Sequence, residues 1–285
     1  MNTKQKENVF NRSGLAALSD LKNLGYQNIF SLLEKEQDVF LIRESEFRSK
    51  EYKWPRDPLH TWSRVWEYPY VYYHMRKNLV HANSASLPKV VDLGSGVTFF
   101  PFIIASLGYE VICLDIDAVC SLDIERALSV LPQQQGKVNF RLIADYKLPL
   151  KSNEVDLVYS VSVMEHIHDF ENTIEEVFRI LKIGGLFILT IDLDLCGYLD
   201  IDLKRYYKLR ECLFKYFDLI ELETTVHPLD ILHSQNGPFP LHKFSSLKKM
   251  IFHMKQQIKP LFGKRPFVAL PNLAVWGGIF IKRRN

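Results

Sequence analysis

The chain lacks the features that would assign it at once to a membrane-spanning or a secreted class. None of its apolar runs approaches the ~20 residues of a membrane-spanning helix. The first eight residues contain no apolar stretch of the kind that forms a secretory signal. The 4 cysteines form no Cys-x-x-Cys pair and have no regular spacing, which indicates reduced thiols rather than a disulfide framework. We therefore expect a soluble protein of the cytoplasm.

A strong charge of one sign is also absent. The 285 residues include 36 basic and 33 acidic side chains, and the formal net charge of +3 is too small to indicate a nucleic-acid partner. We therefore expect no nucleic-acid binding. The sequence does have 47% hydrophobic and 24% charged residues, which is typical of a globular enzyme that buries a sizeable core.

The character of the sequence changes near residue 86. Residues 1–85 are helical in pattern and rich in aromatic side chains, whereas from Lys89 short apolar runs alternate with helical patterns. That alternation predicts an α/β fold with a doubly wound, mostly parallel sheet of about seven strands, in which the last two strands pair antiparallel at one edge. We expect an N-terminal helical region at 1–85 and a second domain at 86–285, which has a helical insertion at about 228–265.

The expected strands and helices have visible boundaries. The strands are expected at Val90–Leu93, Glu110–Asp115, Val138–Ile143, Val155–Ser160, Leu186–Asp192, Phe217–Thr224 and Ala274–Arg283. Helices are expected at Thr173–Lys182, which opens with a capping-box spacing and stops at Gly184, and at Asp202–Lys215. Thr98 is expected to cap the helix after the first strand, with Pro101 in its first turn.

Two glycines and several acids mark the ends of the first strands. The segment Asp92-Leu-Gly94-Ser-Gly96 is the first strand-to-helix turn, where glycine lets a ligand approach the backbone closely. Asp115 ends the second strand, where a carboxylate accepts hydrogen bonds from a ribose diol, and Asp145 follows the third, within reach of an adenine amino group. Because the carboxyl ends of parallel strands meet at one edge of a sheet, these residues predict a nucleoside pocket.

A nicotinamide dinucleotide site also uses a glycine-rich turn followed by an acid. Its Gly-x-Gly-x-x-Gly fingerprint would place the third glycine at Phe99, where a phenylalanine is hard to accommodate. Asp92, just before the turn, would repel a pyrophosphate. A dehydrogenase is therefore disfavoured.

Taken together, the motifs resemble those of the class I S-adenosylmethionine-dependent methyltransferases. Val91 to Gly96 resembles the first motif, Asn153 to Ser160 the fourth strand, and Arg179 to Thr190 the segment that enters the fifth. The resemblance implies S-adenosylmethionine as the cofactor and S-adenosylhomocysteine as the product. It implies cofactor contacts at Asp92, Gly94, Ser95, Gly96, Asp115, Ile116, Asp145, Tyr146, Ser160 and Val161.

Methyl transfer from a sulfonium is an in-line displacement, in which the protein chiefly holds the nucleophile roughly 3 Å from the methyl carbon. A general base is needed only for a hydroxyl or a protonated amine, and His166 is the expected base. The alternative for His166 is a side chain that points to solvent or bonds a carbonyl; His168, Asp192 and Asp194 are weaker candidates. Relatives with Glu-x-x-Glu-His bind a divalent cation, but Ser162 replaces the first acid here, so we expect no metal.

The acceptor is constrained by missing motifs. No Asn- or Asp-Pro-Pro-Tyr segment follows the fourth strand, and no cysteine pair suggests a covalent nucleic-acid intermediate. We expect methylation of an oxygen or nitrogen of a small molecule or glycan; the alternatives are a protein or RNA methyltransferase and a non-catalytic S-adenosylmethionine-binding domain. Trp66, Tyr68 and Tyr70 are expected either to form a substrate lid that excludes water or to belong to the core of the N-terminal helices.

A basic amphipathic helix is expected between the last two strands. From 244 to 261, apolar residues recur at steps of three and four, and lysines lie on the other faces. Three interpretations remain open: a surface helix packed on its own domain, a part of a substrate lid, or a peripheral contact with an anionic membrane. The sequence leaves the oligomeric state open.

Overall fold

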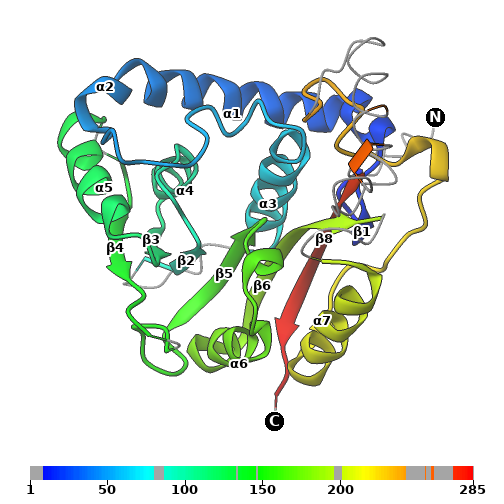
Figure 1. Cartoon of the computed structure of the whole chain (residues 1–285). Helices are drawn as coiled ribbons and strands as arrows, with labels where there is room; N and C mark the ends of the chain where they lie inside the picture. Colours follow the sequence, from blue (N-terminus) through cyan, green and yellow to red (C-terminus); the bar gives the residue numbers. More distant parts are fainter. Residues whose placement is uncertain are drawn as a thin grey trace, which may run out of the picture.

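The computed structural model describes residues 9–79, 87–132, 134–145, 147–195, 201–241, 254, 258–259 and 272–284, in which helices cover both faces of one central sheet (Figure 1). The strands are β1 (Gly14–Leu15), β2 (Lys89–Leu93), β3 (Glu110–Asp115), β4 (Lys137–Leu142), β5 (Val155–Val161), β6 (Leu181–Asp194), β7 (Phe217–Leu219) and β8 (Leu273–Lys282). The α-helices are α1 (Leu24–Ile42), α2 (Glu44–Phe47), α3 (Arg64–Asn78), α4 (Phe100–Ser106), α5 (Ala118–Val130), α6 (Phe170–Ile180) and α7 (Leu203–Tyr216). Short 3-10 helices occupy Leu18–Lys22, Met164–His166 and Pro228–Asp230.

The predicted α/β class and the mostly parallel sheet are confirmed. The sheet has 8 strands in the order β1-β8-β6-β5-β2-β3-β4, with β7 paired to β8. Strands β2 to β6 pair in parallel, whereas β8 runs antiparallel to β6, β7 and β1. The strand number exceeds the predicted seven because Gly14–Leu15, in the segment predicted to be helical, pairs with β8.

The strand order creates one switch point, between β2 and β5. From β2 the chain proceeds outward through β3 to β4, and from β5 it proceeds the opposite way through β6. The neighbouring pair has Asp92 in register with Tyr159. In sheets of this kind the crevice for ligands lies outside the carboxyl ends of the strands at such a point, so the predicted nucleoside residues lie at the expected place.

The apolar strands separate two cores, one on each face of the sheet. Val90 and Tyr159 face the core that α1 to α5 complete, whereas Val91 and Val158 face the core that α6 and α7 complete. Alternate residues of a strand point to opposite faces, so a strand buried on both sides must be apolar throughout. This is why the short apolar runs of the sequence predict β2, β3 and β5 to within a residue or two; β4, at the edge of the sheet, is predicted to within a residue although it is only half-buried.

Predictions of helix starts are partly wrong. The helix predicted at Thr173–Lys182 is α6, which begins three residues earlier, after Asp169, so Thr173 lies inside it and does not cap it. The capping prediction for Thr98 is also wrong, because α4 begins at Phe100 without a side-chain cap, although Pro101 lies in its first turn as predicted. Tertiary packing of the apolar faces sets these boundaries instead of local capping.

The prediction for α7 is confirmed. Asp202 caps this helix: its side chain accepts a hydrogen bond from the backbone nitrogen of Arg205 at 2.8 Å. The following strand, predicted at Phe217–Thr224, is shorter and ends at Leu219.

The N-terminal segment joins the core of the sheet through α3. Trp66 donates a hydrogen bond from Nε1 to Asp20 at 2.8 Å and stacks on Tyr70 with a ring separation of 4.5 Å. A Cβ atom added to Gly277 of β8 would lie 3.0 Å from both rings, so this glycine lets α3 approach the sheet closely. The described N-terminal residues therefore share one core with the sheet, and a domain boundary at residue 85 stays a prediction.

The insertion predicted at about 228–265 is described only in part. Residues 228–241 are described and include a single 3-10 turn at Pro228–Asp230. The predicted basic helix at 244–261 lies outside the described residues except at Met254, Ile258 and Lys259. Within the described ranges, no helix has both the length and the apolar character needed to cross a membrane.

Replacing Trp66 by alanine should lower the free energy of unfolding by about 3–5 kcal/mol, because a fully buried ring leaves a cavity under α3. Trp54→Ala, at a ring that is 55% exposed, should cost less than about 1 kcal/mol. Urea unfolding of both variants gives the comparison. Equal losses would show that α3 is not anchored by Trp66.

Candidate active site

The turn after β2 has the backbone geometry that its glycines predict. Gly94 has a φ of 75° and Gly96 a φ of 52°, both in the left-handed region that favours glycine. The backbone nitrogen of Gly94 donates to the carbonyl of Leu114 at 2.8 Å, which ties the turn to the end of β3. The turn is therefore fixed at the switch point.

The space beside both glycines is filled by the chain itself. A Cβ atom on Gly94 would lie 2.4 Å from Cγ2 of Val163, and one on Gly96 would lie 2.9 Å from the hydroxyl of Tyr52. The hydroxyl of Tyr52 also accepts a hydrogen bond from the nitrogen of Val97 at 3.0 Å. The glycines were predicted to let a ligand approach the backbone. The structure shows that they also let the side chains of Val163 and Tyr52 pack against the turn.

Asp115 lies at the position predicted for a ribose-binding carboxylate. It ends β3, is 8% exposed, and accepts hydrogen bonds from the backbone nitrogens of Gly96 at 2.8 Å and Asp117 at 3.0 Å. Each carboxylate oxygen keeps a second lone pair for a ligand hydroxyl. Ile116 follows with 78% of its surface exposed, which puts an apolar face beside the acid. The ribose contact of Asp115 and the cofactor contact of Ile116 stay predictions.

Asp92 is the most deeply buried acid of the turn region. Burial raises the pKa of its carboxyl group to about 8, and the neighbouring Asp115 carboxylate adds to the rise. At neutral pH Asp92 is therefore mostly protonated and can donate a hydrogen bond as well as accept one. A cationic ligand group beside it would favour the ionised form.

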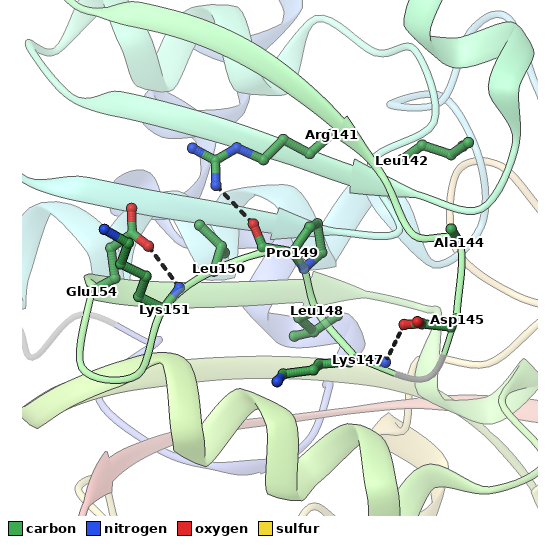
Figure 2. Close-up of a pocket in the computed structure, with 10 residues that line it drawn as sticks. All are labelled: Arg141, Leu142, Ala144, Asp145, Lys147, Leu148, Pro149, Leu150, Lys151 and Glu154. Atoms are coloured by element: carbon green, nitrogen blue, oxygen red, sulfur yellow. Dashed lines mark hydrogen bonds between the residues drawn. The ribbon is translucent and has the colours of Figure 1, made fainter.

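Asp145 lies farther out, on the loop after β4. Its carboxylate accepts a hydrogen bond from the backbone nitrogen of Lys147 at 2.9 Å. It lines an open cavity of about 670 Å³ together with Arg141, Leu142, Ala144, Lys147, Leu148, Pro149, Leu150, Lys151 and Glu154 (Figure 2). The glycine turn and Asp115 do not line this cavity, so it is not the nucleoside crevice at the switch point. The adenine contact of Asp145 stays a prediction, and Tyr146 lies outside the described residues.

The remaining predicted cofactor contacts are buried at the turn and at the end of β5. Ser95 lies in the glycine turn, and its hydroxyl donates to the carbonyl of Gly96 at 3.1 Å. Ser160 and Val161 end β5, and the buried hydroxyl of Ser160 has no hydrogen-bond partner among the described residues. The fold thus brings Ser95, Ser160 and Val161 to the predicted edge of the sheet, and their contacts with a cofactor stay predictions.

The predicted lid residues are packed inside the protein. Trp66 and Tyr70 lie between α3 and β8 as described above. Tyr68 lies farther toward the site, with its ring against Phe99 and Phe100 at centroid distances of 5.5 and 4.6 Å. Trp66 and Tyr70 therefore belong to the core, which is one of the two alternatives stated above. A lid function of Trp66, Tyr68 and Tyr70 stays a prediction.

His166 lies at the end of the 3-10 turn Met164–His166 and its side chain is exposed. Its role as general base stays a prediction. The residue before it, Glu165, is instead buried with 2% exposure.

A polar cluster lies on the β5 and β6 side of the switch point; in it Glu67, Ser162 and Glu165 are buried, and Arg64 and Asp192 are half-buried. The hydroxyl of Ser162 lies 2.7 Å from Oε1 of Glu67 and 3.3 Å from Oδ1 of Asp192. The guanidinium of Arg64 donates to Oε2 of Glu67 at 2.7 Å. Oε1 of Glu165 accepts from the backbone nitrogen of Asp192 at 3.1 Å. We call these five residues the acidic cluster.

Little in the sequence indicates the acidic cluster. Ser162 follows β5 directly and Asp192 lies near the end of β6, and each stands out only singly. Glu67 lies 95 positions before Ser162, and no sequence signal links the two. The periodic pattern of α3 offers one signal, since Arg64 and Glu67 are a polar pair three residues apart in a helix that is otherwise largely buried.

Burial and the charges of neighbouring carboxyl groups raise the pKa of two members of the acidic cluster, Glu165 and Asp192. The pKa of Glu165 lies well above its ordinary value, first because of burial and then because of the charges of Asp192 and Glu67. Burial, followed by the charge of Glu67, raises the pKa of Asp192 to about 8. Among the described residues no group of three or more histidine, cysteine, aspartate or glutamate side chains is arranged to hold a metal ion.

Comparison with known proteins supports the resemblance of the motifs. The methyltransferase domain family matches residues 91–189. A curated protein of Mycolicibacterium smegmatis, described as a probable S-adenosylmethionine-dependent methyltransferase, is 30% identical over 101 residues. That match covers 35% of this chain and 37% of the relative, so the chain spans just over a third of the relative's length. These matches confirm the predicted resemblance, and the family implies S-adenosylmethionine as the cofactor.

One solved structure supports the fold over a longer stretch. The [4+2]-cyclase SpnF aligns over 96% of this chain and all of its own, with a TM-score of 0.51 and 13% identity. The YcgJ protein from Bacillus subtilis aligns over 75% of this chain and 98% of its own, with a TM-score of 0.48 and 14% identity. At this identity the first likeness shows the fold alone.

Gly94→Ala should lower the free energy of unfolding more than Gly184→Ala does. Both glycines have φ near 75°, so both variants incur the cost of about 1–2 kcal/mol for a left-handed alanine. Only Gly94 has a neighbour in the way, because nothing lies within 4 Å of a Cβ on Gly184. An excess loss of about 1–3 kcal/mol is expected from the overlap with Val163, and urea unfolding measures it. Equal losses would mean that Val163 does not close on the turn.

Asp92→Asn should remove part of the pH dependence of stability. Between the unfolded pKa of about 4 and the folded pKa of about 8, the folded protein keeps a proton that the unfolded chain has lost. The free energy of unfolding of the wild type therefore falls as pH rises through this window, by at most about 1.4 kcal/mol per pH unit from this group. The amide of the variant does not titrate, so the stability difference should shift toward the variant as pH rises from about 5 to about 8. A difference independent of pH would contradict the buried, protonated carboxyl.

Proposed function

We propose that this chain, whose residues 91–189 match the methyltransferase domain family, transfers a methyl group from S-adenosylmethionine to an oxygen or nitrogen of a small molecule or glycan. The observation that carries the proposal is the hydrogen bond between the backbone nitrogen of Gly96 and Oδ2 of Asp115, 2.8 Å long. It joins the two elements that a bound adenosine needs at one switch point, a glycine turn and a diol acceptor.

The proposal assigns the two halves of the sheet edge to two ligands. Asp115 and Ile116, on the β3 side, suit the ribose and the base of the cofactor. The acidic cluster, on the β5 and β6 side, suits the acceptor. Val163 joins the two halves, because it packs on Gly94 and follows Ser162 directly.

The bound cofactor supplies an electrophilic methyl carbon on a positively charged sulfur that leaves readily. The chain's own residues then have to orient the acceptor and exclude water, because such a displacement depends mainly on alignment. The burial of Glu67 and Glu165 supports water exclusion on the acceptor side.

The same burial favours a small acceptor over a polymer. A large protein or RNA chain needs an open groove to bring its nucleophile to the reacting carbon, whereas Glu67, Ser162 and Glu165 of the acidic cluster are buried. The net charge of +3 is too small to attract a polyanion such as RNA strongly. A protein or RNA acceptor would be favoured instead if S-adenosylhomocysteine formed only with macromolecular fractions of a cell extract.

A second candidate is a protein of this fold that binds the cofactor without transferring its methyl group. The likeness to a [4+2]-cyclase favours it, because that protein has the same fold and a different named activity. Release of S-adenosylhomocysteine in the presence of an acceptor panel separates the candidates. Tight cofactor binding with no release on any acceptor would favour the second.

Asp115→Asn should weaken S-adenosylhomocysteine binding by about 10- to 100-fold, because charge-assisted hydrogen bonds to the ribose diol are lost. Isothermal calorimetry measures this effect. Asp156→Asn is the matched control: Asp156 lies in β5 at the opposite end of the sheet, where it pairs with Lys182. Unchanged affinity in Asp115→Asn would contradict the assignment of the ribose site.

His166→Ala should lower turnover at least about tenfold while leaving cofactor affinity nearly unchanged, if its imidazole takes the acceptor proton. His168→Ala, at an exposed neighbour, is the control. Steady-state release of S-adenosylhomocysteine gives turnover, and calorimetry gives affinity. Equal turnover in both variants would remove His166 from the reaction.

A further inference from the structure

The acidic cluster has more acidic groups than its one cation can pair. Three carboxyl groups, from Glu67, Glu165 and Asp192, surround the guanidinium of Arg64, whose donors bond Glu67 and the hydroxyl of Ser63. Among the described residues no ion pair joins Glu165 or Asp192 to a cation. The Arg64 guanidinium acts on Glu165 and Asp192 through its charge but makes its ion pair with Glu67, so these two acids can accept a further cationic donor.

Two buried oxygen atoms at this place also have no hydrogen-bond partner among the described residues. They are Oε2 of Glu165, which is 2% exposed, and Oγ1 of Thr190, which is fully buried. Thr190 lies two positions before Asp192 in β6, so both side chains project from the same face of the strand, the face covered by α3. An unsatisfied buried acceptor typically costs about 1–3 kcal/mol, which a ligand donor would recover.

The backbone at the cluster is strained as well. Ser162 has a φ of 47°, a left-handed conformation that is unusual for a residue other than glycine. The conformation directs its hydroxyl to Glu67 and Asp192 together. Strain of this kind at a strand end is retained where surrounding contacts hold it and is frequent at ligand sites.

We propose that the acidic cluster binds the amino group of the methyl acceptor, so that the acceptor is an amine and its nitrogen receives the methyl group. The inference rests on the proposed function and narrows its substrate. An ammonium has a positive charge and several N–H donors, which match Asp192, Glu165 and the hydroxyl of Thr190. A carboxylate or phosphate would be repelled, and a hydroxyl offers one donor and no charge.

The reaction balances with the residues present. The ammonium first gives one proton to the carboxylate of Asp192, which leaves a lone pair on nitrogen. The nitrogen then forms its bond to the methyl carbon as the carbon–sulfur bond breaks, and that electron pair stays on sulfur. No oxidant, reductant or metal is needed. Asp192 suits the proton transfer because burial and the charge of Glu67 raise its pKa to about 8.

The same charges predict that binding of an amine changes the number of protons bound to the protein, which can be measured. Before binding, burial keeps protons on Glu165 and Asp192; an ammonium beside them favours their ionised forms. Amine binding near pH 7 should therefore release about one proton to the buffer. The charged and titratable groups around these acids are Arg64, Glu67 and Tyr68 of α3, Glu165 of the 3-10 turn, Asp192 of β6 and Arg205 of α7.

The test uses pairs of compounds that differ in one functional group. The full-length protein, saturated with S-adenosylhomocysteine, is titrated with n-butylamine and n-butanol and with benzylamine and benzyl alcohol. Calorimetry in two buffers with different ionisation enthalpies gives affinity and proton release together. We expect each amine to bind at least about tenfold more tightly than its alcohol and to release about one proton, whereas the alcohols release none.

Variants separate binding from folding. Asp192→Asn should weaken the binding of both amines at least about tenfold and abolish most of the proton release. The affinity for S-adenosylhomocysteine should change by less than about twofold. Thr190→Val keeps the shape of the side chain and should weaken the binding of both amines severalfold. This variant provides a second test if Asp192→Asn fails to fold. Asp218→Asn, at an exposed acid of β7 that pairs with Arg283, is the control and should leave all values unchanged.

The inference is overturned if amines and alcohols bind equally, if neither amine binds at millimolar concentration, or if amine binding releases no proton. In each of these cases S-adenosylhomocysteine binding by the same sample leaves the proposed function standing. Failure of S-adenosylhomocysteine to bind is the separate result that overturns the proposed function itself.

Discussion

The site depends on one short contact, the hydrogen bond from the backbone nitrogen of Gly96 to the carboxylate of Asp115. This bond fixes the turn after β2 against the end of β3, so the glycine turn and the Asp115 carboxylate lie side by side at the switch point. It requires the left-handed backbone of Gly96 and the parallel register of β2 with β3. Everything assigned to the cofactor follows from that geometry.

Helix α3 couples the acidic cluster to the stability of the fold. Trp66 and Tyr70 of this helix pack on β8, while Arg64 and Glu67 reach the ends of β5 and β6. The apolar contacts of α3 thereby hold Arg64 and Glu67 at the ends of β5 and β6. This burial of charge costs stability and is the usual accompaniment of a functional site.

The strands, the glycine turn and Asp115 are predictable because their signals are local. A strand buried on both faces is a short apolar run, and the turn residues follow it directly in the chain. The start of α6 is not predictable from Thr173, since the helix begins where its apolar face meets the sheet. The acidic cluster is not predictable either, because Glu67 reaches Ser162 only through the packing of α3 across 95 positions of sequence.

The central claim is that the crevice at the switch point binds an adenosine bearing a methionine-derived tail. Calorimetric titration of the wild-type protein with S-adenosylhomocysteine and, separately, with a nicotinamide dinucleotide tests it most directly. The account predicts saturable one-to-one binding of S-adenosylhomocysteine and no heat from the dinucleotide. Binding of the dinucleotide with no heat from S-adenosylhomocysteine would contradict it.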